Sequence, residues 1–139
     1  MKKRFIVLST LVAIGLLTPV THNVGVHVDI VPKKHEEVRT KATMEEKKAN
    51  KIMAMRYAKA GWNWNREQRR CAYSLFMKES RFDHLAKNQQ GSSAFGIGQV
   101  LKETSKDPAI QILNAYKYIK HRYDTPCKAW KHSQLRNWY

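Results

Sequence analysis

A stripe of apolar residues that ends in a carboxylate constrains the fold of this chain more than any other feature of its sequence. Ala72, Leu75 and Phe76 recur at the spacing of one helix face, and Glu79 continues the same face. The pattern therefore predicts a helix that carries an acidic side chain on its buried side, close to its end.

Capping residues indicate where this helix begins. Asn65 is a good N-cap, and Gln68 three positions later gives a variant of the capping box. We expect the helix to run from about Asn65 to Ser80.

Two further helices are indicated by the same kinds of signal. Apolar residues recur at helical spacing over 49–60, and Gly61 follows as a C-cap. Asp107 and Pro108 are typical of an N-cap and a first helical residue, and Pro126 is expected to end that helix. The chain is therefore expected to be mainly helical.

The remaining parts of the C-terminal half carry weaker signals. Residues 93–97 alternate in polarity within a stretch rich in Asn, Gln, Ser and Gly, which indicates a short strand. The last segment contains Trp130, Trp138 and Tyr139. That aromatic content predicts a tail that docks on the folded part.

The N-terminus, residues 1–22, is typical of an export signal. A basic start precedes an apolar run over 5–17, and Pro19 interrupts it. The run is shorter than the roughly 20 residues that a spanning helix needs. Two alternatives remain open: a cleaved signal peptide, or an uncleaved anchor formed by residues 5–20.

A charged spacer is expected over 23–48, ahead of a folded domain over 49–139. The formal net charge of the chain is +15. Such a charge favours binding to polyanions, among them anionic wall polymers, a membrane surface and nucleic acid. The export signal and the lack of a nucleic-acid motif argue against nucleic acid.

Only two cysteines are present, Cys71 and Cys127. In an oxidising compartment such a pair is typical of a disulfide, and two buried thiols are the alternative. Neither the cysteines nor the six histidines have the spacing of metal ligands, so we expect no metal and no cofactor.

Glu79 is the candidate catalytic residue. Desolvation on an apolar helix face raises the pKa of a carboxyl group and keeps it protonated near neutral pH. A protonated acid beside a polar cleft can donate to the leaving oxygen of a glycosidic bond. The alternative is an acid that pairs with Lys78 or Arg81 or that turns out to solvent, and helix geometry alone favours that alternative.

A family resemblance favours the catalytic role of Glu79 over this alternative. The segments 79–82, 86–88 and 92–99 resemble the signature of the soluble lytic transglycosylases and of the goose-type lysozymes. In that signature a Glu-Ser pair ends a helix, and a loop of the form Ser-Gly-Ala-x-Gly-Leu-Met-Gln follows. The later stretches 118–130 and 138–139 resemble a compact secreted subgroup. The resemblance covers about the last 75 residues, close to the whole expected domain.

The resemblance implies a small α+β lysozyme-like domain with a short β-region under the active-site cleft. It implies cleavage of peptidoglycan between N-acetylmuramic acid and N-acetylglucosamine, with Glu79 as the single catalytic acid and a monomer as the working form. It also implies substrate contacts from six residues: Ser80, Ser93, Phe95, Gln99, Tyr118 and Trp130. The sequence departs from the family pattern at four positions: Ser93, Gly98, Asp124 and Lys131.

A second carboxylate would distinguish a hydrolase from a transglycosylase. The candidates are Asp83, Glu103, Asp107 and Asp124, and each has a more ordinary explanation as a turn, cap or solvated residue. In a lytic transglycosylase the 6-hydroxyl of the muramic residue attacks its own anomeric carbon, so no second acid is needed. A lysozyme-type hydrolase on the same fold and an inactive wall-binding module remain the alternatives.

Overall fold

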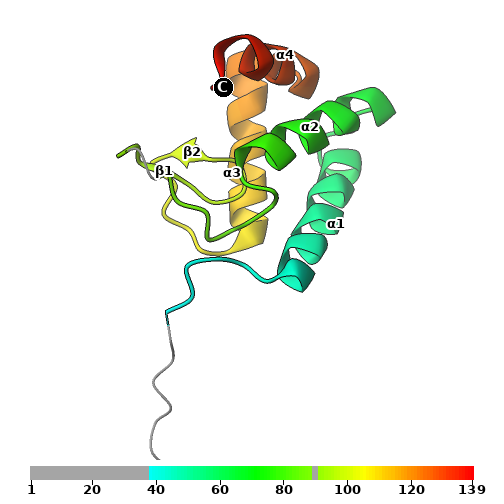
Figure 1. The fold of residues 1–139 in the computed structure, drawn as a ribbon. Coiled ribbons are helices and arrows are strands. Elements are labelled where there is room, and N and C mark those ends of the chain that lie inside the picture. The colour runs from blue at the N-terminus through cyan, green and yellow to red at the C-terminus, as the bar shows by residue number, and fades with distance from the viewer. Residues whose placement is uncertain (1–37, 89–90) are drawn as a thin grey trace, which may run out of the picture. The chain divides into compact units, whose positions relative to one another are not determined.

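The computed structural model describes residues 38–88 and 91–139, which belong to one compact unit that begins at Glu36. This unit is mainly helical, at 58%, as expected, and has one small sheet (Figure 1). Its elements are α1 (Met44–Ala60), α2 (Arg66–Glu79), β1 (Ala94–Phe95), β2 (Val100–Leu101), α3 (Pro108–Tyr123) and α4 (Pro126–Arg136).

The expected export signal, residues 1–22, lies outside the described residues, as does the expected spacer up to residue 37. Within 38–88 and 91–139, no helix has the length and apolar character required to cross a bilayer.

Helix α1 begins five residues earlier than the sequence analysis predicts. Thr43 Oγ1 accepts from the Glu46 backbone N–H at 3.2 Å, and the Glu46 carboxylate accepts from the Thr43 N–H at 2.7 Å. This reciprocal capping box fixes the start at Met44. The prediction of a spacer that continues to Lys48 is therefore wrong for residues 44–48, because these residues form the first turns of a helix.

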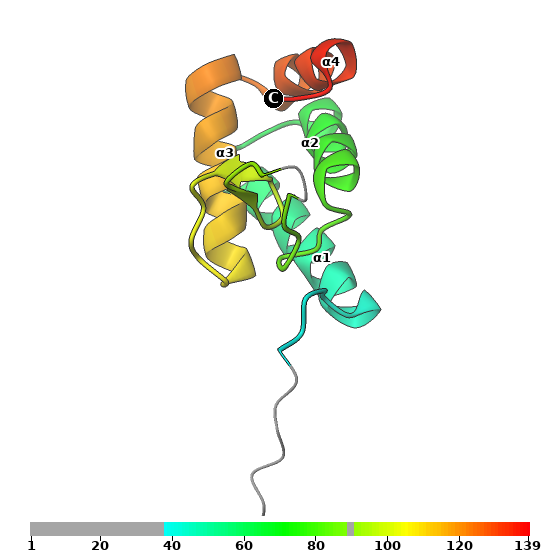
Figure 2. The same cartoon turned by 60° about the vertical axis from the view of Figure 1, so that its left-hand side comes forward.

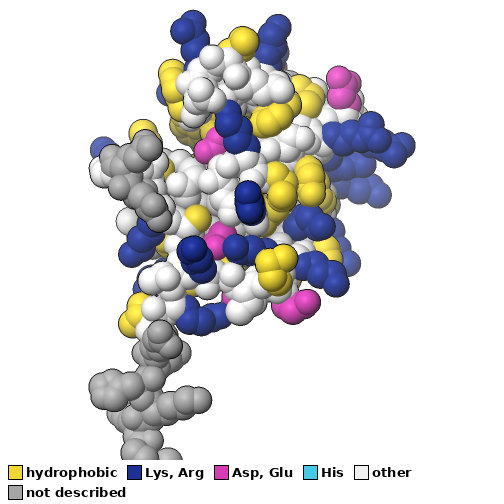
Figure 3. All heavy atoms as spheres, in the orientation of Figure 1, with side chains coloured by type: hydrophobic (Ala, Val, Ile, Leu, Met, Phe, Trp, Pro, Cys, Tyr) yellow, Lys and Arg dark blue, Asp and Glu magenta, His cyan; other side chains and the backbone are white. Residues whose placement is uncertain are grey.

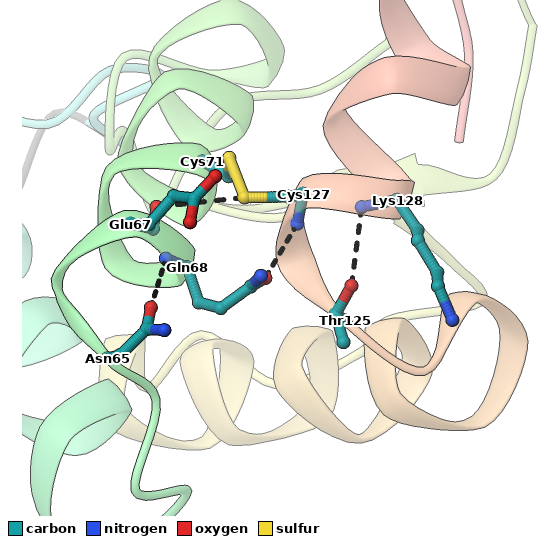
Figure 4. The surroundings of a disulfide bond; sticks show 7 residues. All are labelled: Asn65, Glu67, Gln68, Cys71, Thr125, Cys127 and Lys128. Carbon is teal, nitrogen blue, oxygen red and sulfur yellow. Dashed lines mark hydrogen bonds between the residues drawn. A yellow bond between two sulfur atoms is a disulfide. The ribbon is translucent and has the colours of Figure 1, made fainter.

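Helix α2 forms as predicted, to within one residue at either end. Asn65 Oδ1 accepts from the Gln68 N–H at 2.9 Å, as expected of an N-cap. The predicted capping-box role of the Gln68 side chain is wrong. Its Oε1 accepts instead from the Cys127 N–H at 3.0 Å and so joins α2 to the start of α4 (Figure 4).

Helix α3 starts at Pro108 behind the predicted cap, Asp107, whose carboxylate accepts from the Ala109 N–H at 2.8 Å. The sequence analysis missed α4. Pro126 follows the end of α3, as predicted, but it is also the first residue of α4, and Thr125 caps this helix.

Helix α3 forms the centre of the domain. Figures 1 and 2 show α1 and α2 along one side of it and α4 across its C-terminal end. Tyr116 of α3 is fully buried, stacks on Phe76 of α2 at 5.4 Å between ring centroids, and donates its hydroxyl to Ala54 O of α1 at 2.8 Å. One tyrosine therefore contacts both neighbouring helices through its ring and its hydroxyl.

A disulfide between Cys71 and Cys127 links α2 to α4, as Figure 4 shows. The pairing predicted from the cysteine count is confirmed. The bond joins residues 56 positions apart. It therefore holds the helix that carries Glu79 against the C-terminal helix.

Candidate active site

A cleft of about 530 Å³ opens at the C-terminal end of α2. Its walls come from four parts of the chain: the end of α2, the loop and hairpin that follow it, the second half of α3 and the segment after α4. The lining residues are Glu79, Asn88, Ser92, Ala94, Gln99, Leu101, Tyr118, Arg122, Asn137, Trp138 and Tyr139.

Glu79 is the only acidic side chain in this lining, and it is half-buried. Burial raises the pKa of Glu79 above its ordinary value of 4.5, against the opposing effects of the Lys78 charge and the Ser133 hydrogen bond. Ser133 Oγ donates to Glu79 Oε1 at 3.4 Å. The group therefore has the raised pKa that a proton donor needs.

The basic neighbours of Glu79 in the sequence do not pair with it. Lys78 Nζ donates to Ser133 O at 2.5 Å and to Asn137 Oδ1 at 3.4 Å. Among the ion pairs of residues 38–88 and 91–139, none includes Glu79 or Arg81. In the described part of the chain, neither Lys78 nor Arg81 therefore neutralises Glu79 through an ion pair.

The loop beside Glu79 is fixed by polar side chains from two helices. Ser80 Oγ, directly after α2, donates to Ile97 O at 2.7 Å. From α3, the buried Gln111 accepts from the Ile97 N–H at 2.9 Å and donates to His84 O and Ser105 O. The sequence analysis missed Gln111, although a lone amide on the apolar face of α3 was an available signal.

The backbone conformation and close contacts of Gly96 explain why the loop has glycine at this position. Its φ is +75°, and a Cβ placed on it would lie 2.2 Å from Gln111 Oε1. Any side chain here would displace the amide that holds Ile97.

Gln99 lies at the end of this loop and lines the cleft. Its Nε2 donates to Ala86 O at 3.1 Å and to Gly96 O at 2.8 Å. Its backbone is left-handed, with φ of +48°, a conformation that costs free energy in a non-glycine residue. The amide hydrogen bonds of Gln99 therefore hold a strained backbone in the cleft wall.

Another part of the cleft wall is aromatic. Tyr118 of α3 meets Tyr139 edge-on at 5.6 Å between ring centroids, and Tyr139 donates its hydroxyl to Gly98 O. Burial and the nearby Glu79 charge raise the pKa of Tyr139 well above its ordinary value. The predicted docking of the aromatic tail is confirmed: Trp138 and Tyr139 line the cleft, and Tyr139 contacts the turn between β1 and β2.

Of the seven residues predicted to act on substrate, the structure brings three together: Glu79, Gln99 and Tyr118 line the cleft. The other four, Ser80, Ser93, Phe95 and Trp130, do not line it. Ser80 holds the loop, as described above.

Each of the remaining three has an identifiable position. Ser93 lies on the hairpin, where its Oγ accepts from the Lys102 N–H at 3.3 Å. Phe95 follows Ala94 in β1 and is absent from the lining of the cleft, to which Ala94 belongs. Ser93 and Phe95 line a shallower neighbouring hollow. Trp130 packs against the hydrophobic core.

The four candidate second carboxylates all lie outside the cleft lining. Asp83 is buried and accepts from the Ala42 and Leu85 N–H groups; burial opposes its ionisation, but these hydrogen bonds and Lys47, 3.0 Å away, outweigh that effect and lower its pKa. Glu103 accepts from Asn114 at 2.8 Å, Asp107 caps α3, and Asp124 pairs with Lys120 and Lys128.

A basic surface lies on another part of the domain. Figure 3 shows Lys and Arg side chains gathered over α1 and α2, with hydrophobic side chains between them. Two adjoining hollows share Tyr73 and are bordered by seven basic residues: Lys47, Lys48, Lys51, Arg66, Arg69, Arg70 and Arg81. Apart from Lys47, none of these side chains has an ion pair among the described residues.

In the described part of the chain, no group of three or more His, Cys, Asp or Glu side chains could hold a metal ion. Comparison of the chain with protein families, curated proteins and solved structures found no match.

Proposed function

We propose that this chain is an exported peptidoglycan lytic transglycosylase with a lysozyme-like fold, related to the soluble lytic transglycosylases that its sequence resembles. The observation that carries the proposal is the position of Glu79. It is a half-buried carboxyl group with a raised pKa, and it is the only acidic side chain among the residues that line the cleft.

In the first step, the protonated Glu79 donates its proton to the oxygen between N-acetylmuramic acid and N-acetylglucosamine. The glycosidic bond breaks, and the leaving sugar takes the bonding electrons as its new hydroxyl. The muramic ring then carries an oxocarbenium-like positive charge, and the Glu79 carboxylate that remains stabilises it.

In the second step, the 6-hydroxyl of the muramic residue attacks its own anomeric carbon. Glu79 takes the hydroxyl proton and so returns to its starting state, and the product is a 1,6-anhydro sugar. The attacking group belongs to the substrate, so this step needs no positioned water and no base for it. A hydrolase with two carboxylates would need a second one roughly 5–9.5 Å away. The four candidate second carboxylates make their contacts outside the cleft: Asp83, Glu103, Asp107 and Asp124. Their positions support the transglycosylase over the hydrolase.

Two other features fit the proposal. The Cys71–Cys127 disulfide is compatible with an exported location. The basic surface on α1 and α2 would attract phosphate-rich wall polymers to the domain.

The proposal is tested by incubating the full chain with purified peptidoglycan and measuring soluble glycan fragments. Glu79→Gln keeps the size of the side chain but cannot donate a proton, and it should abolish release. Glu67→Gln is the matched control, because Glu67 is exposed on the first turn of the same helix. Release that survives in Glu79→Gln, or that is absent from the folded wild-type protein, would contradict the proposal.

A further inference from the structure

Arg122 is the only basic residue among those that line the cleft. It lies on α3, one turn after Tyr118, and its side chain is exposed. Its guanidinium carbon is 5.1 Å from the ring centroid of Trp138, 5.7 Å from that of Tyr123 and 5.9 Å from that of Tyr118. Three aromatic rings therefore hold the guanidinium in position at the edge of the cleft.

These contacts fix the guanidinium without neutralising it. A cation–π contact stabilises the charge through the ring face and leaves N–H groups of the guanidinium able to donate in the plane of the fork. None of the ion pairs formed within residues 38–88 and 91–139 includes Arg122. The nearest acid in the sequence, Asp124, pairs with Lys120 at 2.6 Å and with Lys128 at 3.2 Å.

The charge of the cleft has a consequence for its ligand. When Glu79 carries the proton that it donates, Arg122 is the one charged side chain among the residues that line the cleft. The glycan backbone of peptidoglycan is neutral, because the lactyl carboxyl of each muramic residue is bound to its stem as an amide, and it gives such a charge nothing to pair with. A planar guanidinium with free donors is suited to a carboxylate, which it can bind through two parallel hydrogen bonds.

We propose that Arg122 forms a subsite for a carboxylate of the peptide stem that muramic acid carries, and that the cleft therefore selects stem-bearing glycan over bare glycan. This inference rests on the proposed function, because it assigns the substrate class of the same cleft. Arg122 is a specificity-determining residue in this account, and it takes no part in proton transfer.

Binding to the full chain that carries Glu79→Gln tests the subsite, since this variant should not cleave its ligand. Two ligands are compared by calorimetry: soluble glycan oligomers with their peptide stems, and bare glycan, which is the same oligomers after an amidase has removed the stems and the lactyl carboxylates thus exposed have been converted to neutral amides. We expect about ten-fold tighter binding of the stem-bearing glycan, which is the effect of one charged hydrogen-bonded pair.

Three substitutions in that background identify the residue responsible. Arg122→Gln should reduce the affinity for stem-bearing glycan to that for bare glycan, and should leave bare glycan unaffected. Arg122→Lys should retain part of the preference, because it keeps the charge but not the fork. Arg56→Gln is the matched control: it removes one exposed arginine from α1, away from the cleft, and should change neither affinity.

Equal affinity for the two glycans, or a preference that survives Arg122→Gln, would overturn the subsite and leave the proposed function intact. A preference that depends on Arg122 in a protein whose wild-type form cleaves nothing would support the subsite and overturn the catalytic proposal. Absence of binding to either glycan would overturn both.

Discussion

The Ser133 hydroxyl donates a hydrogen bond to Glu79 Oε1 over 3.4 Å and so connects the end of α2 to α4. Ser133 is fully buried and Glu79 is half-buried, so this contact is partly shielded from water. The disulfide and the bond from Cys127 N–H to Gln68 join the same two helices at their other ends. Helix α4 therefore positions and tunes the candidate acid, although it contributes no acid of its own to the cleft lining.

Ser133→Ala should extend activity to higher pH. The Ser133 hydrogen bond stabilises ionised Glu79 and lowers its pKa, so its loss raises that pKa. A proton donor acts in its protonated form, and the alkaline limb of the pH–rate profile should therefore shift to higher pH. Ser74→Ala, on α2 but outside the cleft, is the control. A limb that moves to lower pH would contradict the assigned donor.

Glu79→Gln should stabilise the protein more at neutral pH than in acid. Burial holds the pKa of Glu79 in the folded state above 4.5. The stability that this group contributes is therefore fully present below pH 4.5 and is lost as pH rises through the folded pKa. Glutamine does not titrate. The Tm difference between variant and wild type, measured from pH 4 to 8, should grow in favour of the variant; a constant difference would argue that Glu79 titrates normally.

Loss of the disulfide should cost about 4 kcal/mol in the free energy of unfolding, from the loop entropy of a 56-residue separation. Cys71→Ser with Cys127→Ser should lower the urea midpoint of the full chain. Reduction of the wild type should reproduce that shift and should have no effect on the double variant. An unchanged wild-type midpoint after reduction would mean that the thiols are unpaired.

Gly98→Ala should destabilise the protein by about 1–3 kcal/mol through overpacking. The added Cβ would lie 2.5 Å from the Cβ of Ala115 and 3.1 Å from the Tyr139 hydroxyl. Ala115→Gly removes the closest atom, so the double variant should be more stable than the sum of the single effects predicts. Strict additivity of the single effects in urea unfolding would contradict this packing. The packing gives a physical reason for glycine at position 98, where the family signature that the sequence resembles has Met.

Binding to purified cell wall should depend on the basic surface of α1 and α2. Reversal of Lys48, Lys51 and Arg70 to Glu should weaken co-sedimentation with wall several-fold and flatten its dependence on salt. Reversal of the exposed Lys102, Lys106 and Lys117 makes the same change in net charge elsewhere. Equal losses in the two triple variants would mean that total charge alone, and not this surface, directs binding.

The helices that could be predicted from the sequence are those with local signals. Asn65 and Asp107 form the expected caps because a cap needs only the next turn of the helix. Helix α4 was missed because its buried face includes Ser133, a polar residue that breaks the apolar periodicity. The early start of α1 was missed because its first turn is charged and mostly exposed, although Thr43 and Glu46 have the spacing of a capping box.

The candidate site was predictable only where one element decides a side chain's direction. Helical spacing placed Glu79 on the buried face, and the structure agrees. Phe95 and Trp130 occupy matching positions along the sequence, but Phe95 lines the neighbouring hollow and Trp130 packs against the core. Gln111 and Arg122 act through contacts with residues distant in sequence, such as Ile97 and Trp138, so no local pattern predicts those partners, although Gln111 itself stands out as a lone amide on an apolar helix face.

The central claim is that Glu79 drives non-hydrolytic cleavage, and mass spectrometry of the products from purified peptidoglycan tests it most directly. The account predicts fragments that end in 1,6-anhydro-muramic acid with the wild type and with Glu67→Gln, and none with Glu79→Gln. Fragments with ordinary reducing ends would identify a hydrolase instead. No soluble fragment from the folded wild type would contradict the claim altogether.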